Sequence, residues 1–248
     1  MTDRTAVGGR RAVVEAIRAG RVTDVLVAPG IRDTQGLRAV VEAAASAGID
    51  LQEMNRAELD RLAPDHQGVV ARLRDDAERP SELGERDLGS FPFEDDALVV
   101  VLDGITDPQN FGAAARSAEA AGAAVLVSRT RRAADVTPAA IRASAGALLH
   151  LPLARVANIP RALDRLQAAG FTVVGLDGDA GETIFDRPCP DGRVALVVGS
   201  EGEGMSRLVR ERCDLLVALP MRGRVGSLNA SASLAAALYG YVLASRGP

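Results

Sequence analysis

The sequence predicts an α/β protein with two domains, a small N-terminal one and a larger C-terminal one built on a parallel sheet. From Ala97 onward, near-continuous apolar strands alternate with helices, which is typical of a parallel sheet covered on both faces. A shorter alternation precedes it, set apart by an acidic segment at 74–96 that contains prolines and glycines but no apolar period. We therefore expect domains at 1–73 and 97–248, joined by a flexible linker at 74–96.

The small domain is predicted to alternate helices with short strands. An amphipathic helix over 10–19 is expected to stop at Gly20, because glycine readily takes the left-handed conformation that ends helices. The alternating, β-branched stretch 22–28 predicts a strand. The remaining expected elements are a helix over 39–47, a strand at 49–52, a helix over 56–62 and a strand at 69–73.

The large domain is predicted to repeat strand and helix throughout. We expect strands at 97–103, 123–128, 148–153, 172–177, 194–199 and 215–220, and helices at 112–121, 137–145, 159–169, 204–212 and 229–245. By itself this pattern indicates an ordinary doubly wound sheet without a knot. In such sheets, ligands bind beyond the carboxyl ends of the strands.

Composition limits where the chain can reside. The 47% hydrophobic content is ample for a core, and no apolar run reaches the 18 residues that suggest a membrane span. The N-terminal stretch lacks the apolar core of a secretory signal. Only Cys189 and Cys213 are present, which is too few for a disulfide framework. We therefore expect a cytoplasmic protein with no membrane partner.

The net charge of −4 does not exclude a nucleic-acid partner. Residues 75–96 hold nine acids against Arg79 and Arg86, a local charge of −7, so the rest of the chain carries +3. All 29 basic residues are arginine, whose planar fork suits phosphate, although genomic codon bias explains the absence of lysine as well.

The sequence carries no sign of metal or hydrolase chemistry. It has no CxxC pair, no HExxH motif and no cluster of histidines with carboxylates, so we expect no metal. His66 and His150 are the only histidines, which makes a Ser-His-Asp hydrolase a poor candidate. His150 lies in an apolar stretch and is expected in the core, whereas His66 is expected to hold a turn and is given no chemistry.

Three short motifs follow predicted strands in the C-terminal half. They are NFGAAAR at 110–116, GSEGEG at 199–204 and SLNAS at 227–231. Each has a structural alternative: Asn110, Ser227 or Asn229 can cap a helix, and Arg116 can be a surface cation. The glycine spacing G-x-x-G-x-G does not match the G-x-G-x-x-G of a dinucleotide-binding loop, which disfavours phosphate binding there.

Together these motifs resemble those of the SpoU/TrmH class of RNA ribose 2'-O-methyltransferases, in the SPOUT superfamily. The opening GGRRAVVEAI and the triplet His66-Gln67-Gly68 resemble an L30e-like RNA-binding domain found in front of some of these enzymes. The resemblance implies a trefoil knot near the C-terminus, S-adenosylmethionine as cofactor, RNA as substrate and a homodimer. Within the class, the chain looks most like bacterial enzymes that methylate a guanosine ribose of 23S rRNA. A tRNA-directed or antibiotic-resistance rRNA methyltransferase is the nearest alternative.

The resemblance also assigns roles to residues. It implies the catalytic residues Asn110, Arg116, Glu201 and Asn229, and the cofactor-binding residues Gly199, Leu219, Met221, Ser227 and Leu228. We expect RNA contacts from Arg10, Arg11, Arg222 and Arg224, because arginine commonly binds phosphate.

The role of Arg116 in proton transfer is open. The resemblance assigns it as the group that receives the 2'-hydroxyl proton, yet a guanidinium keeps its own proton to about pH 12. We favour a role in orienting the substrate and stabilising charge. Two other classes also remain open: an NAD-dependent enzyme, disfavoured because LDGITDPQNFG is no glycine fingerprint, and a catalytically inert RNA-binding protein.

Overall fold

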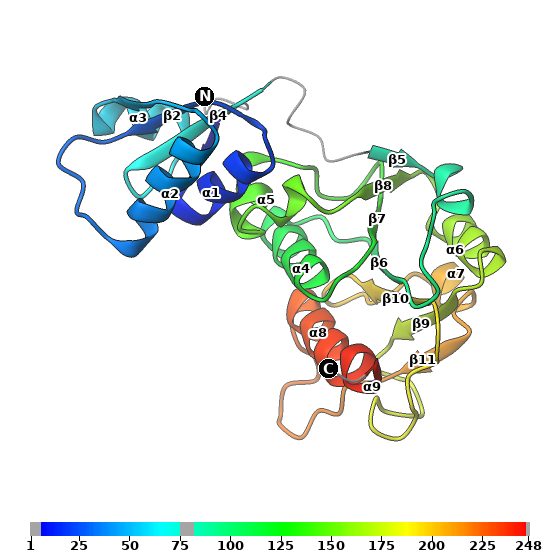
Figure 1. Cartoon of the computed structure of the whole chain (residues 1–248). Coiled ribbons are helices and arrows are strands. Elements are labelled where there is room, and N and C mark those ends of the chain that lie inside the picture. The colour runs from blue at the N-terminus through cyan, green and yellow to red at the C-terminus, as the bar shows by residue number, and fades with distance from the viewer. Residues whose placement is uncertain (1–5, 75–81, 247–248) are drawn as a thin grey trace. The chain divides into compact units, whose positions relative to one another are not determined.

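The computed structural model describes residues 6–74 and 82–246 of the chain, which divides into two compact units (Figure 1). Unit 1 comprises residues 1–80 and 135–150, and unit 2 comprises residues 81–134 and 151–248. The division differs from the expected domains because residues 135–150 leave the C-terminal part of the sequence and belong to unit 1.

Unit 1 is a four-stranded mixed sheet with helices. Its strand order is β1 (Ala6–Gly8), β4 (Val69–Leu73), β2 (Val22–Val27) and β3 (Leu51–Glu53). β4 runs antiparallel to both of its neighbours, and β2 and β3 are parallel. The helices are α1 (Arg10–Arg18), α2 (Gln35–Ser46), α3 (Arg56–Leu62) and α5 (Pro138–Ala143), with a 3-10 turn, η3, at Ala147–Leu149.

Capping explains where the helices of unit 1 begin and end. Gly20 follows α1 with φ 67°, as expected for a glycine stop. Thr34 accepts a hydrogen bond from the Leu37 amide, so α2 begins at Gln35, earlier than the apolar period alone predicts. Asn55 caps α3 in the same way through the Glu58 amide.

Residues 135–150 complete the core of unit 1. Ile141 and Leu149 are buried in the same cluster as Val13, Ile17 and Val25. The strand predicted at 148–153 is wrong: η3 occupies its first half, and β8 begins at Leu153. His150 is exposed and not in the core, and its Nε2 lies 3.3 Å from the Glu15 carboxylate.

Unit 2 is a seven-stranded sheet in which every strand pairing of the described residues is parallel, as predicted. The strand order is β11 (Leu215–Val217), β9 (Thr172–Leu176), β10 (Val194–Gly199), β6 (Leu98–Asp103), β7 (Val125–Arg129), β8 (Leu153–Val156) and β5 (Glu82–Gly84). All residues of the central β6 and β10 are buried, because helices cover both faces.

The helices of unit 2 lie on two sides of the sheet (Figure 1). One side carries α4 (Pro108–Ala120), α8 (Ala230–Ala237) and α9 (Ala244–Arg246), and the other carries α6 (Ile159–Ala168) and α7 (Arg207–Arg210). The predicted helix over 229–245 is interrupted by a π-helical stretch, η4, at Leu238–Leu243, and the one over 204–212 shrinks to α7.

The segment from Glu82 to Asp96 is part of unit 2 and not a free linker. β5 pairs with β8, and a 3-10 turn, η2 (Asp87–Gly89), follows it. Leu88 and Phe93 are buried in the main core of the sheet, which the acidic composition of the segment obscures. Residues 75–81 of the expected linker lie outside the described residues.

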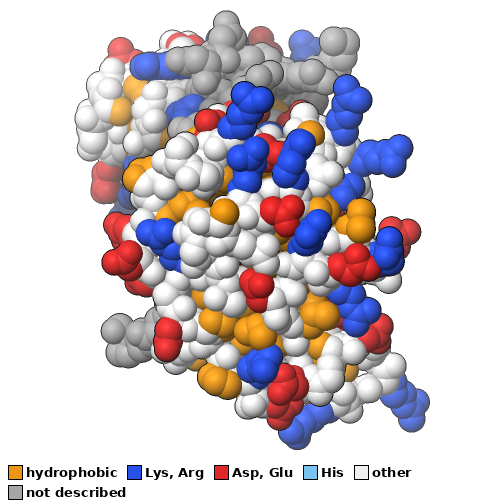
Figure 2. Space-filling view, turned by 90° about the vertical axis from the view of Figure 1, so that its right-hand side faces the viewer, with side chains coloured by type: hydrophobic (Ala, Val, Ile, Leu, Met, Phe, Trp, Pro, Cys, Tyr) orange, Lys and Arg blue, Asp and Glu red, His pale blue; other side chains and the backbone are white. Residues whose placement is uncertain are grey.

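The face of unit 2 that carries α6 and α7 mixes basic and acidic side chains (Figure 2). Arg161 pairs with Glu85, and Arg207 pairs with Glu211. Arg212 lies 3.4 Å from Asp164. These three arginines each have an acidic neighbour on this face, which offsets their charge locally.

The substitution Ile141→Ala tests whether residues 135–150 belong to unit 1. We expect it to lower the free energy of unfolding by about 2–5 kcal/mol, because the side chain is buried and its loss leaves a cavity. Hydrogen exchange should then show faster exchange for the amides of β2 and β4. Val41→Ala, at a side chain that is 43% exposed, is the control and should change little. Faster exchange confined to unit 2 would contradict the assignment.

Candidate active site

The loops after β9, β10 and β11 enclose a cavity of about 640 Å³ in unit 2. Its lining comes from residues 176–180, 183, 198–205, 218–221 and 226–228, with Arg210 of α7 and with Ala230 and Ser233 of α8. This is the carboxyl edge of the parallel sheet, where the topology predicts a ligand. A cavity of this volume is typical of small-molecule sites.

The glycine-rich loop after β10 closes on itself beside the cavity. Ser200 and Gly204 exchange two backbone hydrogen bonds of 3.0 Å. Gly199 permits this closure, because a Cβ there would lie 2.0 Å from the carbonyl carbon of Gly204. Gly202 and Gly204 have φ values of 86° and 68°, which most side chains disfavour. The glycines of the motif are therefore required by the backbone path of the loop.

The residues predicted to bind the cofactor all line this cavity. They are Gly199, Leu219, Met221, Ser227 and Leu228. The cavity thus collects residues from the second and third motifs, which are separated in sequence and brought together by the order of β9, β10 and β11 in the sheet.

The cavity also has polar residues that the sequence analysis missed. Asp177, directly after β9, forms an ion pair with Arg210, with Asp177 Oδ2 2.7 Å from Arg210 Nε, and both residues line the cavity. With Asp179, Glu201 and Glu203, the lining holds four carboxylates against one guanidinium, a formal charge of −3. An acidic residue at the end of an apolar strand was the available signal for Asp177.

Asn110, Glu201 and Asn229, one residue from each motif, are joined by hydrogen bonds. The side-chain amide of Asn229 donates to Asn110 Oδ1 at 2.8 Å and to Glu201 Oε2 at 3.3 Å. Asn110 is free to accept because it does not cap α4: Asp107 is the N-cap and accepts from the Asn110 backbone amide at 2.9 Å. Three of the four predicted catalytic residues therefore meet in one network.

Asn229 serves the helix and the network at once. Its Oδ1 accepts from the backbone amide and hydroxyl of Ser231, at 2.9 and 2.6 Å, and so caps α8. Its Nδ2 remains for Asn110 and Glu201. The capping interpretation of this residue is therefore confirmed, and its side chain also contacts the two other predicted catalytic residues, whose catalytic role stays a prediction.

Asp103 anchors the second motif to the end of β6. Its side chain is 3% exposed, and its Oδ2 accepts from the Ser206 backbone amide at 2.7 Å. Arg129, at the end of β7, approaches the other carboxylate oxygen at 3.4 Å. The buried carboxylate thereby fixes where the loop that carries Glu201 rejoins the sheet.

Arg116 stands apart from the network. It lies on α4 six residues after Asn110, which places the two side chains on different faces of the helix, about 120° apart. Its side chain is exposed and pairs with none of the described residues. The RNA-binding candidates also fall into separate places: Arg222 and Arg224 are exposed in the loop before α8, whereas Arg10 and Arg11 belong to unit 1.

Two family models match the chain. One, described as the SpoU rRNA Methylase family, matches residues 97–239. The chain belongs to this family. The other, described as RNA 2'-O ribose methyltransferase substrate binding, matches residues 6–78.

Curated relatives agree with this assignment. The chain is 41% identical to the 23S rRNA (guanosine-2'-O-)-methyltransferase RlmB of Haemophilus influenzae, over 88% of each protein. It is 43% identical to an uncharacterized tRNA/rRNA methyltransferase of Mycolicibacterium vanbaalenii, over 92% of this chain and 73% of the relative.

Solved structures of family members share the fold over nearly the whole chain. A crystal structure of an RNA 2'-O ribose methyltransferase aligns with a TM-score of 0.81 and 29% identity, covering 97% of this chain and 88% of the other. The SpoU methyltransferase AviRb of Streptomyces viridochromogenes, in complex with AdoMet, aligns with a TM-score of 0.71 and 30% identity, covering 96% and 88%. The predicted α/β fold with a parallel-sheet SPOUT-like domain is confirmed.

Several other features of this family member bear on its chemistry. Within residues 6–74 and 82–246, no helix is long and apolar enough to cross a membrane, and no group of three or more His, Cys, Asp or Glu residues could hold a metal ion.

Burial raises the pKa of the Cys213 thiol to about 12, and the nearby Asp214 and Asp177 add to the shift. That thiol therefore stays protonated at neutral pH and is a poor nucleophile.

Asn229→Ser separates capping from the network. Serine caps helices about as well as asparagine, so we expect thermal stability to change little. The lost amide donor should lower RNA methylation about 100-fold, as for other donors that orient a reacting group. Asn158→Ser, at the residue that caps α6 outside the cavity, is the matched control and should keep full activity. Equal losses in both variants would argue against the network.

Proposed function

We propose that this protein transfers a methyl group from S-adenosylmethionine to a ribose 2'-hydroxyl of RNA, and that the target is a guanosine of 23S rRNA. The observation that carries the proposal is the Asn110–Asn229–Glu201 network beside an acidic, glycine-lined cavity. The 41% identity to a 23S rRNA (guanosine-2'-O-)-methyltransferase, over 88% of each chain, favours that nucleotide over a tRNA or antibiotic-resistance target.

The charge of the cavity fits S-adenosylmethionine. This ligand carries a sulfonium and an ammonium cation with one carboxylate, a net charge of +1, and the lining has a formal charge of −3. The same charge repels the phosphates of a dinucleotide, which argues against an NAD-dependent enzyme. Leu176, Leu219 and Leu228 supply apolar wall, and the closed loop after β10 presents backbone amides and carbonyls. These residues would hold the adenosine and methionine parts of the cofactor.

The reaction is a displacement at carbon. When bound, S-adenosylmethionine supplies an electrophilic methyl whose bond to sulfur breaks as the ribose oxygen bonds to it. The electron pair of the broken bond stays on sulfur, and the proton of the 2'-hydroxyl passes to a base of the protein. Most of the protein's contribution is to position the ribose oxygen and the methyl group in line.

Glu201 is the residue we assign as that base. Its carboxylate is exposed, lines the cavity and is held 3.3 Å from Asn229 Nδ2. A carboxylate is ionised at neutral pH and can accept a proton, whereas the Arg116 guanidinium cannot. Asn229, which also donates to Asn110, keeps Glu201 in place. Arg116, an exposed cation without a partner among the described residues, is left to bind the target phosphate and stabilise charge.

The remaining expectations belong to the same proposal. Arg222 and Arg224, exposed in the loop beside the cavity, are placed to contact RNA phosphates. We place the enzyme in the cytoplasm. We also infer that it forms a homodimer, which the exposed apolar side chains Val225, Leu228 and Tyr239 around α8 support. The trefoil knot near the C-terminus stays a prediction from the resemblance.

Transfer of tritiated methyl groups from S-adenosylmethionine to unmodified rRNA and tRNA tests the proposal. We expect incorporation into 23S rRNA as 2'-O-methylguanosine, identified by nuclease digestion and chromatography. Glu201→Gln should lower turnover at least 100-fold, because the amide cannot take the proton. Glu203→Gln, in the same loop but outside the network, is the control and should lose far less.

Arg116→Lys tests the orienting role within the same assay. The variant keeps the charge but loses the paired donors, so we expect a loss of about tenfold or more. Full activity of Arg116→Lys would contradict that geometric role. Absence of transfer to any RNA, with cofactor binding intact by calorimetry, would instead favour an inert RNA-binding protein.

A further inference from the structure

Unit 1 contains a cavity of about 630 Å³ that the active site does not explain. It lies where the start of α1, the segment before α2, the start of α3 and the turn at 65–68 meet. Three arginines, Arg10, Arg32 and Arg56, contribute to its lining. The turn contributes Asp65, His66, Gln67 and Gly68 to the same cavity, and α3 also contributes Asp60, so the lining holds three guanidiniums and two carboxylates.

The turn at 65–68 has an unusual, well-supported backbone. Asp65 and Gln67 have φ values of 58° and 51°, in the left-handed region that residues other than glycine seldom adopt. His66, 7% exposed, holds the turn: its Nδ1 accepts from the Gly68 amide at 2.8 Å. Its Nε2 therefore carries the proton and donates to Asp60 Oδ1 at 3.1 Å. Backbone strain of this kind persists where the surroundings enforce it, often at functional sites.

The strained turn presents Gln67 to the cavity. Its side chain is exposed and has no hydrogen-bond partner among the described residues. The side chain of Asp65, two residues earlier, is likewise exposed without a described partner. A rigid turn thus displays an amide and a carboxylate, groups that together can donate and accept hydrogen bonds in a fixed direction.

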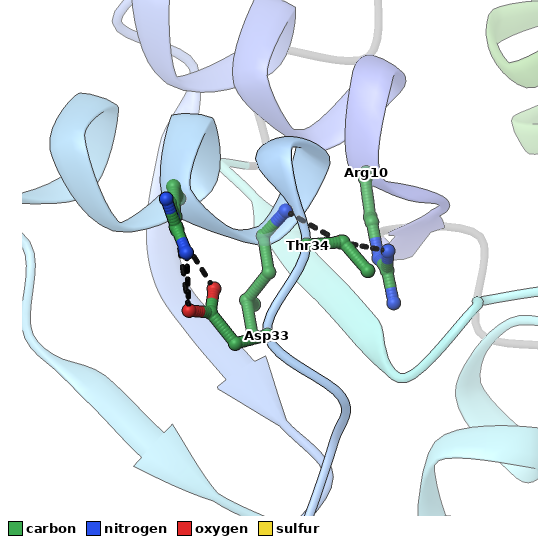
Figure 3. A network of polar contacts seen from close by, with 5 residues as sticks. Arg10, Asp33 and Thr34 are labelled. Carbon is green, nitrogen blue, oxygen red and sulfur yellow. Dashed lines mark hydrogen bonds and ion pairs between the residues drawn. The ribbon is translucent and has the colours of Figure 1, made fainter.

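Arg10, which also lines the cavity, is held in place by a hydrogen bond. It begins α1, and its Nη1 donates to Thr34 Oγ1, the side chain that caps α2 (Figure 3). Its Nε is buried without a partner among the described residues. Arg32 and Arg56 are exposed and form no ion pair with a described residue. The cavity therefore has three guanidiniums whose donors are largely uncommitted, a combination suited to phosphate.

We propose that this cavity reads one unpaired nucleotide of the RNA substrate, with Gln67 and Asp65 at the edge of the base and Arg10, Arg32 and Arg56 at the adjoining phosphates. Ile31, which also lines the cavity, supplies an apolar surface for the base. The volume is ample for a nucleotide. A paired base is excluded because A-form RNA hides its edges in a deep, narrow groove. The inference rests on the proposed function, since it names how the same RNA is selected.

The test measures binding of the full-length protein to four ribo-oligonucleotides. They are 12-residue uridine tracts that carry A, C, G or U at the central position, and affinity is read by fluorescence anisotropy. We expect the wild-type protein to prefer one or two of the four by about tenfold or more, the discrimination typical of a pair of base-edge hydrogen bonds. Gln67→Ala should abolish the preference while leaving the weakest of the four affinities unchanged.

Matched variants separate base reading from phosphate binding. Arg56→Ala should weaken all four oligonucleotides equally and reduce the slope of log affinity against log salt by about one. Arg61→Ala on the same helix, and Gln35→Ala at the start of α2, lie outside the cavity and should change neither preference nor slope. Gln67→Asn keeps an amide on a residue that tolerates the left-handed backbone, so it shows whether loss of preference comes from misfolding of the turn.

The possible outcomes are distinct. No preference in the wild-type protein, or an unchanged preference in Gln67→Ala, would overturn the inference. Loss of preference in Gln67→Ala, with thermal stability and S-adenosylmethionine binding unchanged, would support it, and methyl transfer should then suffer in KM and not in kcat. Base preference without methyl transfer to any RNA would leave the nucleotide site standing and refute the proposed function alone.

Discussion

The proposed active site depends on the side chain of Asn229. One end of its amide caps α8, and the other joins Asn110 on α4 to Glu201 in the loop after β10. The cap fixes the side-chain rotamer of Asn229, and the fixed rotamer directs the two amide protons toward Asn110 of the first motif and Glu201 of the second. Residues from three distant stretches of sequence thus share one small set of hydrogen bonds, so a shift in any of the three elements is transmitted to the reacting group.

The loop after β10 is the second constraint, and it works by exclusion. Gly199 lets the loop approach β10 so closely that no side chain fits, and Asp103 holds the far end of the loop through the Ser206 amide. The loop is therefore anchored at both ends while its tip, with Glu201, stays exposed. Anchoring of this kind preorganises the Glu201 carboxylate, which we propose as the base, and leaves it accessible to solvent and to a substrate proton.

The sequence predicts the strands of the parallel sheet better than it predicts the boundaries of the domains and of the other elements. Apolar strands such as 97–103 and 194–199 are recognisable because both faces are buried, and the five residues predicted to bind the cofactor, which line one cavity, are recognisable by motif. The errors arise where a tertiary contact overrides local composition. The acidic composition of the stretch from Glu82 predicts a linker, although Leu88 and Phe93 are buried in the core. The apolar run around His150 predicts a strand, but its first half forms a 3-10 turn. The network of Asn229 with Glu201 could not be derived from spacing, since it depends on how the loops after the strands meet.

A tertiary contact also brings residues 135–150 into unit 1, and this makes unit 1 dependent on the C-terminal part of the sequence. Residues 135–150 lie between β7 and β8 in sequence yet supply Ile141 and Leu149 to the core of unit 1. Among the described residues, the chain therefore passes from unit 2 to unit 1 at 134–135 and returns at 150–151. A cut within 75–81 would leave the N-terminal residues without part of their core, so the unit that carries the nucleotide cavity is not an independent module. The nucleotide selection that we propose for unit 1 therefore depends on the structural integrity of a unit whose core is completed by a segment embedded in the sequence of unit 2.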